Sequence, residues 1–204
     1  MKLYYAPGAC SMGIHIVLEE IGASYELVKL DLKAGEQYKP PFSEINPKSK
    51  VPTLIRDDGM VLTEYPVIAH YLAETHANSG LLPSEIDASL QSAAAMDYCV
   101  STIHMQGFAR LFRPENFAPG NLDAAKEQGR QMVEKGFAIM SKMLGTKEYV
   151  AGSFSLGDTA LFYVEFWGAK RMGMTLPANL AAHLDRMLAR PAVQRMLAQE
   201  GLTA

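Results

Sequence analysis

Residues 46–72 decide the fold, and they read NPKSKVPTLIRDDGMVLTEYPVIAHYL. The β-rich part opens with Val51-Pro52, and a proline cannot donate a ladder hydrogen bond, so this pair belongs at a strand start, an edge or a bulge. The DDG turn at 57–59 predicts a hairpin between Val51–Ile55 and Met60–Leu62. At such an edge, the backbone of Val51 is a candidate partner for an extended ligand.

Thr63-Glu64 follows the hairpin and precedes a helical pattern of apolar residues at positions 67, 68, 71 and 72. This order puts an acidic side chain and backbone N–H groups at a helix N-terminus. Together with the edge at Val51, the helix start can hold both ends of a small zwitterion. The same local pattern is equally consistent with a hairpin and a capped helix that bind no ligand.

The segments around this stretch predict an α/β domain over residues 1–77. Lys2–Ala6 has a strand pattern, and a Pro-Gly turn then leads to Cys10 and Ser11 at the start of a helix. Tyr25–Leu32 alternates apolar and polar residues as a second strand, and Pro66–Thr75 is the closing helix. The resulting order is βαβ-α-ββα, with a short irregular helix expected between Lys33 and Asn46.

A linker at 78–83 separates this domain from an all-helical domain expected over residues 84–204. Its strongest helical patterns cover 86–110, 122–144, 180–188 and 191–199. Ser155-Leu156-Gly157-Asp158 has the form of a capping box, in which Ser155 and Asp158 satisfy each other's backbone N–H groups. We therefore interpret Asp158 as a fold residue rather than a catalytic aspartate.

Composition excludes several classes of protein. The 204 residues are 49% hydrophobic and 20% charged, which is typical of a globular chain. The formal net charge of −3 offers no basic surface for nucleic acid. No apolar run approaches the roughly 20 residues of a membrane-spanning helix. The two cysteines lie far apart, which predicts no disulfide and favours the cytoplasm.

Four motifs occur together in one order: MKLYYAPGACS at 1–11, NPKSKVP at 46–52 with LTE at 62–64, GF at 107–108 with LFRP at 111–114, and SLGD at 155–158. Nearly the whole chain thereby resembles the bacterial, beta-class-like glutathione S-transferases. The resemblance implies a thioredoxin-like N-terminal domain, a helical C-terminal domain that contributes the hydrophobic substrate site, and glutathione as co-substrate. It also implies a cytoplasmic homodimer with a role in detoxification.

Cys10 is the first candidate for the chemistry. A thiol at a helix N-terminus has its thiolate stabilised by N–H groups and the helix dipole, so we expect Cys10 to titrate low and to form a mixed disulfide with oxidised glutathione. Without a second cysteine of a C-x-x-C pair, a dithiol cycle is excluded. The alternative for Cys10 is a small buried core residue. The resemblance adds Ser11 and Tyr5 as hydroxyl donors to the glutathione sulfur.

The resemblance implies that glutathione binds through Val51, Pro52, Glu64, Tyr65 and Lys33. Glu64 is the candidate partner of the α-ammonium group at the glutamyl end. Tyr65 stands where the family has a small residue whose N–H and hydroxyl hold the carboxylate. The backbone N–H survives this change, whereas the hydroxyl contact has to be remade by tyrosine or is lost.

The electrophile pocket implied by the resemblance involves Tyr98, Thr102, Met105 and Gln106. His104 lies one residue before the histidine of the family pattern, and one residue is about 100° around a helix. We therefore expect His104 to point elsewhere. Cys99 belongs to an apolar helical stretch and is expected in the core.

Three further histidines, His15, His70 and His76, lack metal-ligand spacing with Cys10 or with one another, so no metal is expected. Two functions fit these residues. The first is a glutathione transferase that conjugates glutathione to small hydrophobic electrophiles, with thiol–disulfide exchange through Cys10 as a further activity. The second is a binding module that holds glutathione or a hydrophobic ligand without turnover.

Overall fold

The structure, a computed structural model, describes residues 1–203. Packing divides the chain into two compact units. The first contains residues 1–82 together with the segment from Met187 onward, and the second is Pro83–Arg186. The expected domains 1–77 and 84–204 stay a prediction, and the structure adds that the C-terminal segment packs within the first unit.

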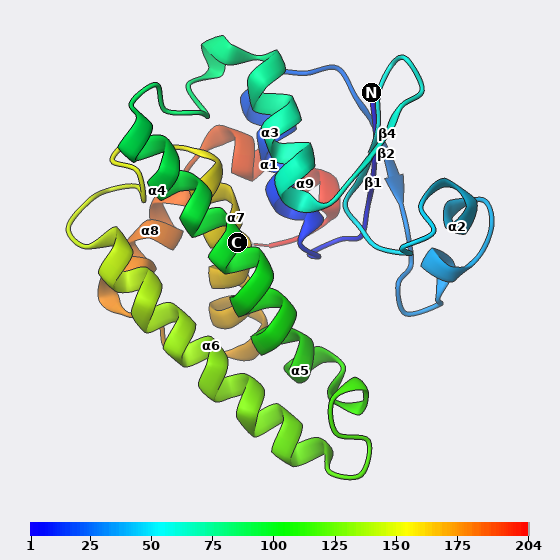
Figure 1. The fold of residues 1–204 in the computed structure, drawn as a ribbon, viewed down its shortest axis with the longest axis vertical. Helices are drawn as coiled ribbons and strands as arrows, with labels where there is room; N and C mark the ends of the chain where they lie inside the picture. The colour runs from blue at the N-terminus through cyan, green and yellow to red at the C-terminus, as the bar shows by residue number, and fades with distance from the viewer. Residues whose placement is uncertain (204) are drawn as a thin grey trace. The chain divides into compact units, whose positions relative to one another are not determined.

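The first unit is a mixed sheet covered by helices (Figure 1). Its elements are β1 (Lys2–Tyr5), α1 (Ser11–Glu20), β2 (Glu26–Lys29), η1 (Glu36–Tyr38), α2 (Phe42–Ile45), β3 (Thr53–Ile55), β4 (Val61–Thr63), α3 (Tyr65–Thr75), η2 (Ala77–Ser79) and α9 (Pro191–Glu200). The strand order is β2-β1-β3-β4. β1 is parallel to β2 and antiparallel to β3, which is antiparallel to β4. The predicted α/β fold is confirmed, with β2 and β3 shorter than their apolar patterns.

Alternate side chains of β1 face opposite sides of the sheet, as the pleat requires. The Tyr4 ring lies 5.3 Å from the ring of Phe42 in α2. The Tyr5 ring lies 6.0 Å from the ring of His15 in α1. Helices α1 and α2 therefore cover opposite faces of the sheet, as Figure 1 shows.

Helix α9 is tied to α1 by a buried carboxylate. Glu200 Oε1 lies 2.9 Å from His15 Nδ1, and both side chains are fully buried. Glu200 Oε2 accepts a hydrogen bond of 2.8 Å from the Gly8 N–H. Since Gly8 is in the turn that precedes Cys10, the last helix of the chain holds the turn that leads to the candidate thiol.

The second unit is helical (Figure 1). Its elements are α4 (Ile86–Asp97), η3 (Tyr98–Phe108), α5 (Ala109–Phe112), η4 (Pro114–Asn116), α6 (Leu122–Leu144), α7 (Leu156–Phe166), η5 (Trp167–Arg171) and α8 (Ala178–Leu188). The long helix expected over 86–110 is confirmed as the continuous run of α4, η3 and α5. The sequence did not reveal that its middle, η3, is wound as a π-helix.

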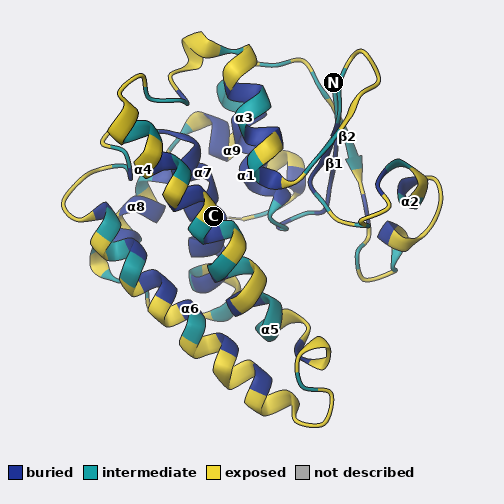
Figure 2. Ribbon diagram, in the orientation of Figure 1, coloured by how far each residue is buried: buried dark blue, intermediate teal, exposed yellow. Residues whose placement is uncertain are grey.

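Glycines let η3 and α6 approach each other closely. A Cβ on Gly107 would lie 2.7 Å from a Val133 methyl group, and one on Gly136 would lie 2.7 Å from the Ile103 side chain. Buried positions of α6 recur every three or four residues, so the helix presents one buried stripe and an exposed outer side (Figure 2). No helix in residues 1–203 combines the length and the apolar character that a membrane crossing requires.

A buried cluster of charged groups joins α7 to α8. The capping box predicted at Ser155 is confirmed, since Asp158 Oδ2 accepts from the Ser155 N–H at 2.9 Å. His183 Nε2 lies 3.2 Å from Asp158 Oδ1, and His183 Nδ1 lies 2.8 Å from Glu165 Oε2. All three side chains are fully buried. Asp158 thus caps a helix and partners a histidine, with no access to substrate.

Candidate functional site

Cys10 lies at the N-cap of α1, where the Pro-Gly turn delivers it from the end of β1. Its Sγ donates a hydrogen bond of 3.3 Å to the carbonyl oxygen of Val51. The residue is partly exposed, while Cys99 is fully buried as expected. The structure therefore brings together the start of α1 and the backbone just before β3. Because β3 lies between β1 and β4, Val51-Pro52 is a strand start and not a sheet edge.

The expectation that Cys10 titrates low is wrong for this structure. Burial around the sulfur raises the pKa of the Cys10 thiol to about 12. The backbone N–H groups of Cys10 and Ser11 and the charge of Lys50 lower this pKa, and they do not outweigh burial. The thiol is therefore neutral at pH 7, and it serves as a donor to Val51 rather than as a thiolate.

We predict that Cys10 is alkylated slowly at neutral pH. With a pKa near 12, its thiolate fraction at pH 7 is more than about 100-fold below that of an ordinary cysteine. The rate of iodoacetamide labelling, measured by mass spectrometry in a Cys99→Ala background, should keep rising through pH 10. A plateau reached near pH 7 would contradict this assignment.

Ser11 and Tyr5 face the protein interior. The Ser11 hydroxyl accepts from the Ala6 N–H at 3.3 Å and lies 3.4 Å from the Ala6 carbonyl oxygen, and the residue is fully buried. Tyr5 is 6% exposed and packs beside His15, and its burial raises the pKa of its hydroxyl. Cys10 is thus the most accessible of the three candidates.

Glu64 is the N-cap residue of α3, with a backbone φ of 70° in the left-handed region. In a non-glycine residue this conformation causes backbone strain. The strained residue lies at the predicted ligand site. Its carboxylate is exposed and paired, since Lys48 Nζ lies 2.7 Å from Glu64 Oε1 and 2.9 Å from Thr63 Oγ1. Glu64 was predicted from the sequence as a site residue, whereas Lys48, which lies within the NPKSKVP motif, was not.

Tyr65 turns its side chain away from the helix start. The residue is 4% exposed, and its ring packs over α1 at Gly13. A Cβ on Gly13 would lie 2.1 Å from Tyr65 Oη. The tyrosine hydroxyl therefore lies against α1. Gly13, a glycine within that helix, is the residue in the sequence that makes room for it.

We predict that Gly13→Ala destabilises the fold. The overlap with Tyr65 costs about 1–3 kcal/mol, more than the roughly 1 kcal/mol that alanine gains over glycine inside a helix. Chemical denaturation should show the loss with Tyr65 present. In a Tyr65→Ser background the same substitution should be neutral or stabilising. Equal losses in both backgrounds would show that Tyr65 is not the obstacle.

The remaining predicted glutathione residues differ in exposure. Pro52 is buried at the start of β3, next to Val51. Lys33 is exposed in the loop after β2, where its N–H donates to Asp31 Oδ1 at 2.8 Å. Within residues 1–203, no hydrogen bond or ion pair joins Lys33 to Cys10, Val51 or Glu64.

In the helical unit, the four predicted pocket residues all belong to η3. Tyr98, Thr102 and Gln106 are spaced by four residues, which places them on one face of the helix. Burial raises the pKa of the Tyr98 hydroxyl. Met105 is 40% exposed.

His104 points toward α7 and η5. Its ring lies 4.7 Å from the Trp167 ring, and its Nδ1 lies 3.4 Å from the Tyr163 hydroxyl. The histidine therefore packs edge-on among aromatic rings of its own unit.

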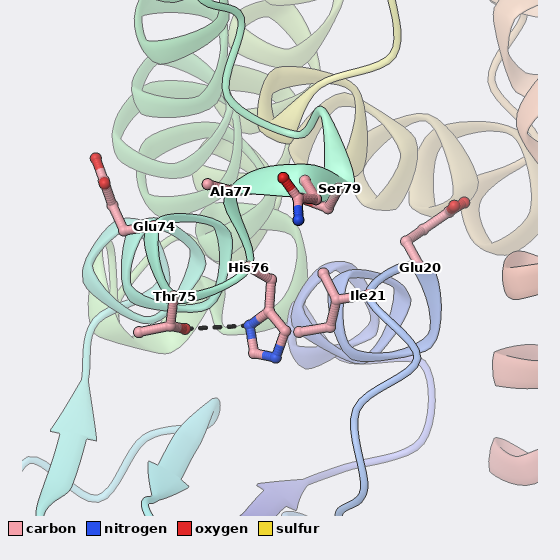
Figure 3. A pocket seen from close by; sticks show the side chains of 8 residues that line it. Glu20, Ile21, Glu74, Thr75, His76, Ala77 and Ser79 are labelled. Carbon is pink, nitrogen blue, oxygen red and sulfur yellow. Dashed lines mark hydrogen bonds between the residues drawn. The ribbon is translucent and has the colours of Figure 1, made fainter.

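A cavity of about 630 Å³ lies at the far end of α1 (Figure 3). It is lined by Glu20, Ile21 and residues 74–79. Since Cys10 is at the opposite end of the helix, about 15 Å away at 1.5 Å per residue, this cavity does not belong to the candidate site. Among the residues that the structure describes, no group of three or more His, Cys, Asp or Glu side chains is arranged to hold a metal ion.

Known proteins are similar to this chain in sequence and in fold. The family model for the glutathione S-transferase N-terminal domain matches residues 1–74. Glutathione S-transferase GstA of Escherichia coli O157:H7 is 34% identical over 206 residues, covering 99% of this chain and 100% of that protein.

Two solved structures match over their full lengths. A sphingomonad glutathione S-transferase complexed with glutathione is 35% identical, with a TM-score of 0.85 and 100% of each chain covered. The beta-class glutathione S-transferase of Sphingomonas chungbukensis is 34% identical, with a TM-score of 0.86 and 100% of each chain covered.

Proposed function

The chain belongs to the glutathione S-transferase family and acts as a glutathione transferase, and from this premise we propose where its chemistry takes place. Glutathione lies along the backbone of Val51 and Pro52 just before β3, with its sulfur at the start of α1 beside Cys10. Backbone N–H groups and the dipole of α1 stabilise the glutathione thiolate. The thiolate attacks the electrophile, a carbon–sulfur bond forms, and the leaving group departs with its electron pair.

One observation carries this proposal: the 3.3 Å contact between Cys10 Sγ and the Val51 carbonyl oxygen. It joins a helix N-terminus, which favours an anion, to the backbone of Val51, which precedes the paired residues of β3 and can meet an extended peptide. Because burial raises the pKa of Cys10 to about 12, the thiol beside the glutathione sulfur is neutral. A neutral thiol does not repel the glutathione thiolate, which supports conjugation by glutathione over exchange through Cys10.

The electrophile is a small hydrophobic molecule in this proposal, and it binds at Tyr98, Thr102, Met105 and Gln106 of η3. An exposed methionine and a half-buried tyrosine offer an adaptable apolar surface with one polar end.

The test is turnover with two substrate classes. Cys10→Ala should keep conjugation of 1-chloro-2,4-dinitrobenzene to within about tenfold of the native rate, since it removes one neutral hydrogen bond. Cys99→Ala is the matched control, because it also removes one thiol. If conjugation is abolished by Cys10→Ala alone, Cys10 is essential to it and the proposal fails. If glutathione–disulfide exchange is the faster native reaction and Cys10→Ala removes it, the protein is an oxidoreductase.

We also propose that the protein is a cytoplasmic homodimer with a role in detoxification. In support, each unit exposes apolar side chains that a partner would cover. Met60 and Val67 are 55% and 52% exposed in the first unit, and Ile86 and Leu90 are 68% and 58% exposed in the second. Light scattering at micromolar concentration should give the mass of two chains, and the mass of one chain would contradict the homodimer.

A further inference from the structure

We propose that Lys48 binds the α-carboxylate of the glutamyl end of glutathione and thereby determines specificity for that end. The proposal rests on glutathione binding at the site described above. In the ligand-free structure Lys48 is paired with Glu64, and on binding it exchanges that carboxylate for the carboxylate of the ligand.

The glutamyl end of glutathione is a zwitterion, with an ammonium and a carboxylate group on the same carbon atom. A site that holds it needs an anion and a cationic or N–H donor close together. Glu64 supplies the anion at the start of α3. The site also needs a donor for the carboxylate of the ligand.

The start of α3 keeps the backbone N–H of Tyr65 and is poor in side-chain donors. Pro66 is the second residue of the helix and has no N–H, so one of the groups that a helix N-terminus offers to an anion is missing. The hydroxyl group of Tyr65 lies against α1 at Gly13, inside the protein. Neither residue provides the side-chain donor that a carboxylate at this position requires.

Lys48 is placed to supply the missing donor. Its Nζ is 2.7 Å from Glu64 Oε1 and 2.9 Å from Thr63 Oγ1, so it lies within one side-chain length of the helix start. The side chains of Lys48 and Glu64 are 54% and 56% exposed. An ion pair this exposed is worth little, so exchanging its partners costs little.

The exchange conserves charge. The free site holds one cation and one anion, and the glutamyl end brings one of each. When the ammonium of the ligand replaces Lys48 at Glu64, Lys48 pairs with the carboxylate, and four charges form two new pairs. If Lys48 remained paired with Glu64, it would compete with the ammonium group of the ligand for Glu64. The carboxylate of the ligand would then have no cationic partner.

Calorimetry with three ligands tests this role. The ligands are glutathione, γ-aminobutyryl-cysteinylglycine, which lacks the α-carboxylate, and glutaryl-cysteinylglycine, which lacks the α-ammonium. We expect Lys48→Met to weaken glutathione binding by about three- to fivefold, the upper part of the range for an ion pair at a solvent-exposed site. Binding of the ligand without the carboxylate should change by no more than about twofold. Lys48→Arg should restore most of the affinity for glutathione.

Lys2→Met is the matched control, because Lys2 is also a surface lysine paired with a glutamate, at 3.2 Å from Glu26. It should leave all three affinities unchanged. If Lys48→Met leaves glutathione affinity unchanged or raises it, Lys48 is a bystander or a competitor for Glu64, and the proposal is overturned. Equal losses for glutathione and the ligand without the carboxylate would show that Lys48 only orients Glu64, which also overturns it. A native protein that binds no glutathione would instead refute the proposed function itself.

Discussion

Replacing Glu200 by alanine is expected to lower the free energy of unfolding by about 2–6 kcal/mol, because it removes the partner of two buried hydrogen-bonding groups at about 1–3 kcal/mol each. Its carboxylate accepts from the Gly8 N–H and lies 2.9 Å from His15 Nδ1, and both side chains are fully buried. The substitution leaves two buried polar groups without partners. It also releases the turn before Cys10, so glutathione affinity should fall with stability.

Urea denaturation followed by circular dichroism measures the effect. Gln194→Ala is the matched control, since Gln194 is an exposed residue of the same helix. It should change stability by no more than about 0.5 kcal/mol. Glu200→Gln, which keeps an acceptor for Gly8, should fall between the two. If Glu200→Ala were as mild as the control, the buried network would contribute nothing to folding.

Replacing His183 by glutamine is expected to cost a similar amount, about 3–5 kcal/mol at pH 7. The histidine lies between Asp158 and Glu165, and all three side chains are fully buried. Without it, two carboxyl groups of α7 lose their cation in an environment that water does not screen. Glu165 already has one oxygen, Oε1, buried without a hydrogen-bond partner.

The same cluster makes stability depend on pH. Burial lowers the pKa of His183, but the charge of Glu165 and hydrogen bonds to Asp158 and Glu165 outweigh it and raise the pKa from 6.5 to about 9. Burial raises the pKa of Glu165 from 4.5 to about 7. In both cases the folded state holds the proton more tightly than the unfolded chain does, so stability falls as pH rises.

For His183 the stabilisation is fully present below pH 6.5 and is lost as the pH rises through 9. For Glu165 the stabilisation is fully present below pH 4.5 and is lost as the pH rises through 7, because the buried carboxyl group then ionises. The free energy of unfolding of the native protein should therefore decrease from pH 6.5 to 9, and His183→Gln should remove the part of the decrease that comes from His183. His70→Gln, a partly exposed histidine of α3, should leave the profile unchanged. A native profile that is flat across this range would contradict the assignment.

Local signals accounted for most of the fold. The hairpin of β3 and β4 follows from the DDG turn, and α6 follows from apolar spacing over residues 122–144. The capping box at Ser155 needs only residues three apart in the sequence. Such features are set by neighbours along the chain, so one sequence is enough to predict them. The family motifs likewise placed Cys10, Val51 and Glu64.

By itself, then, the sequence determined the order of strands and helices and the capping box, and it singled out Val51-Pro52 at the start of a strand. Only the tertiary structure decided the environment of each group. It buried the Cys10 sulfur and raised its pKa, directed Tyr65 into the space left by Gly13, and paired Lys48 with Glu64. It also joined His15 to a carboxylate 185 positions away. The physical reason is that desolvation and ion pairing depend on which surfaces meet after folding, and spacing along a chain does not encode those distances.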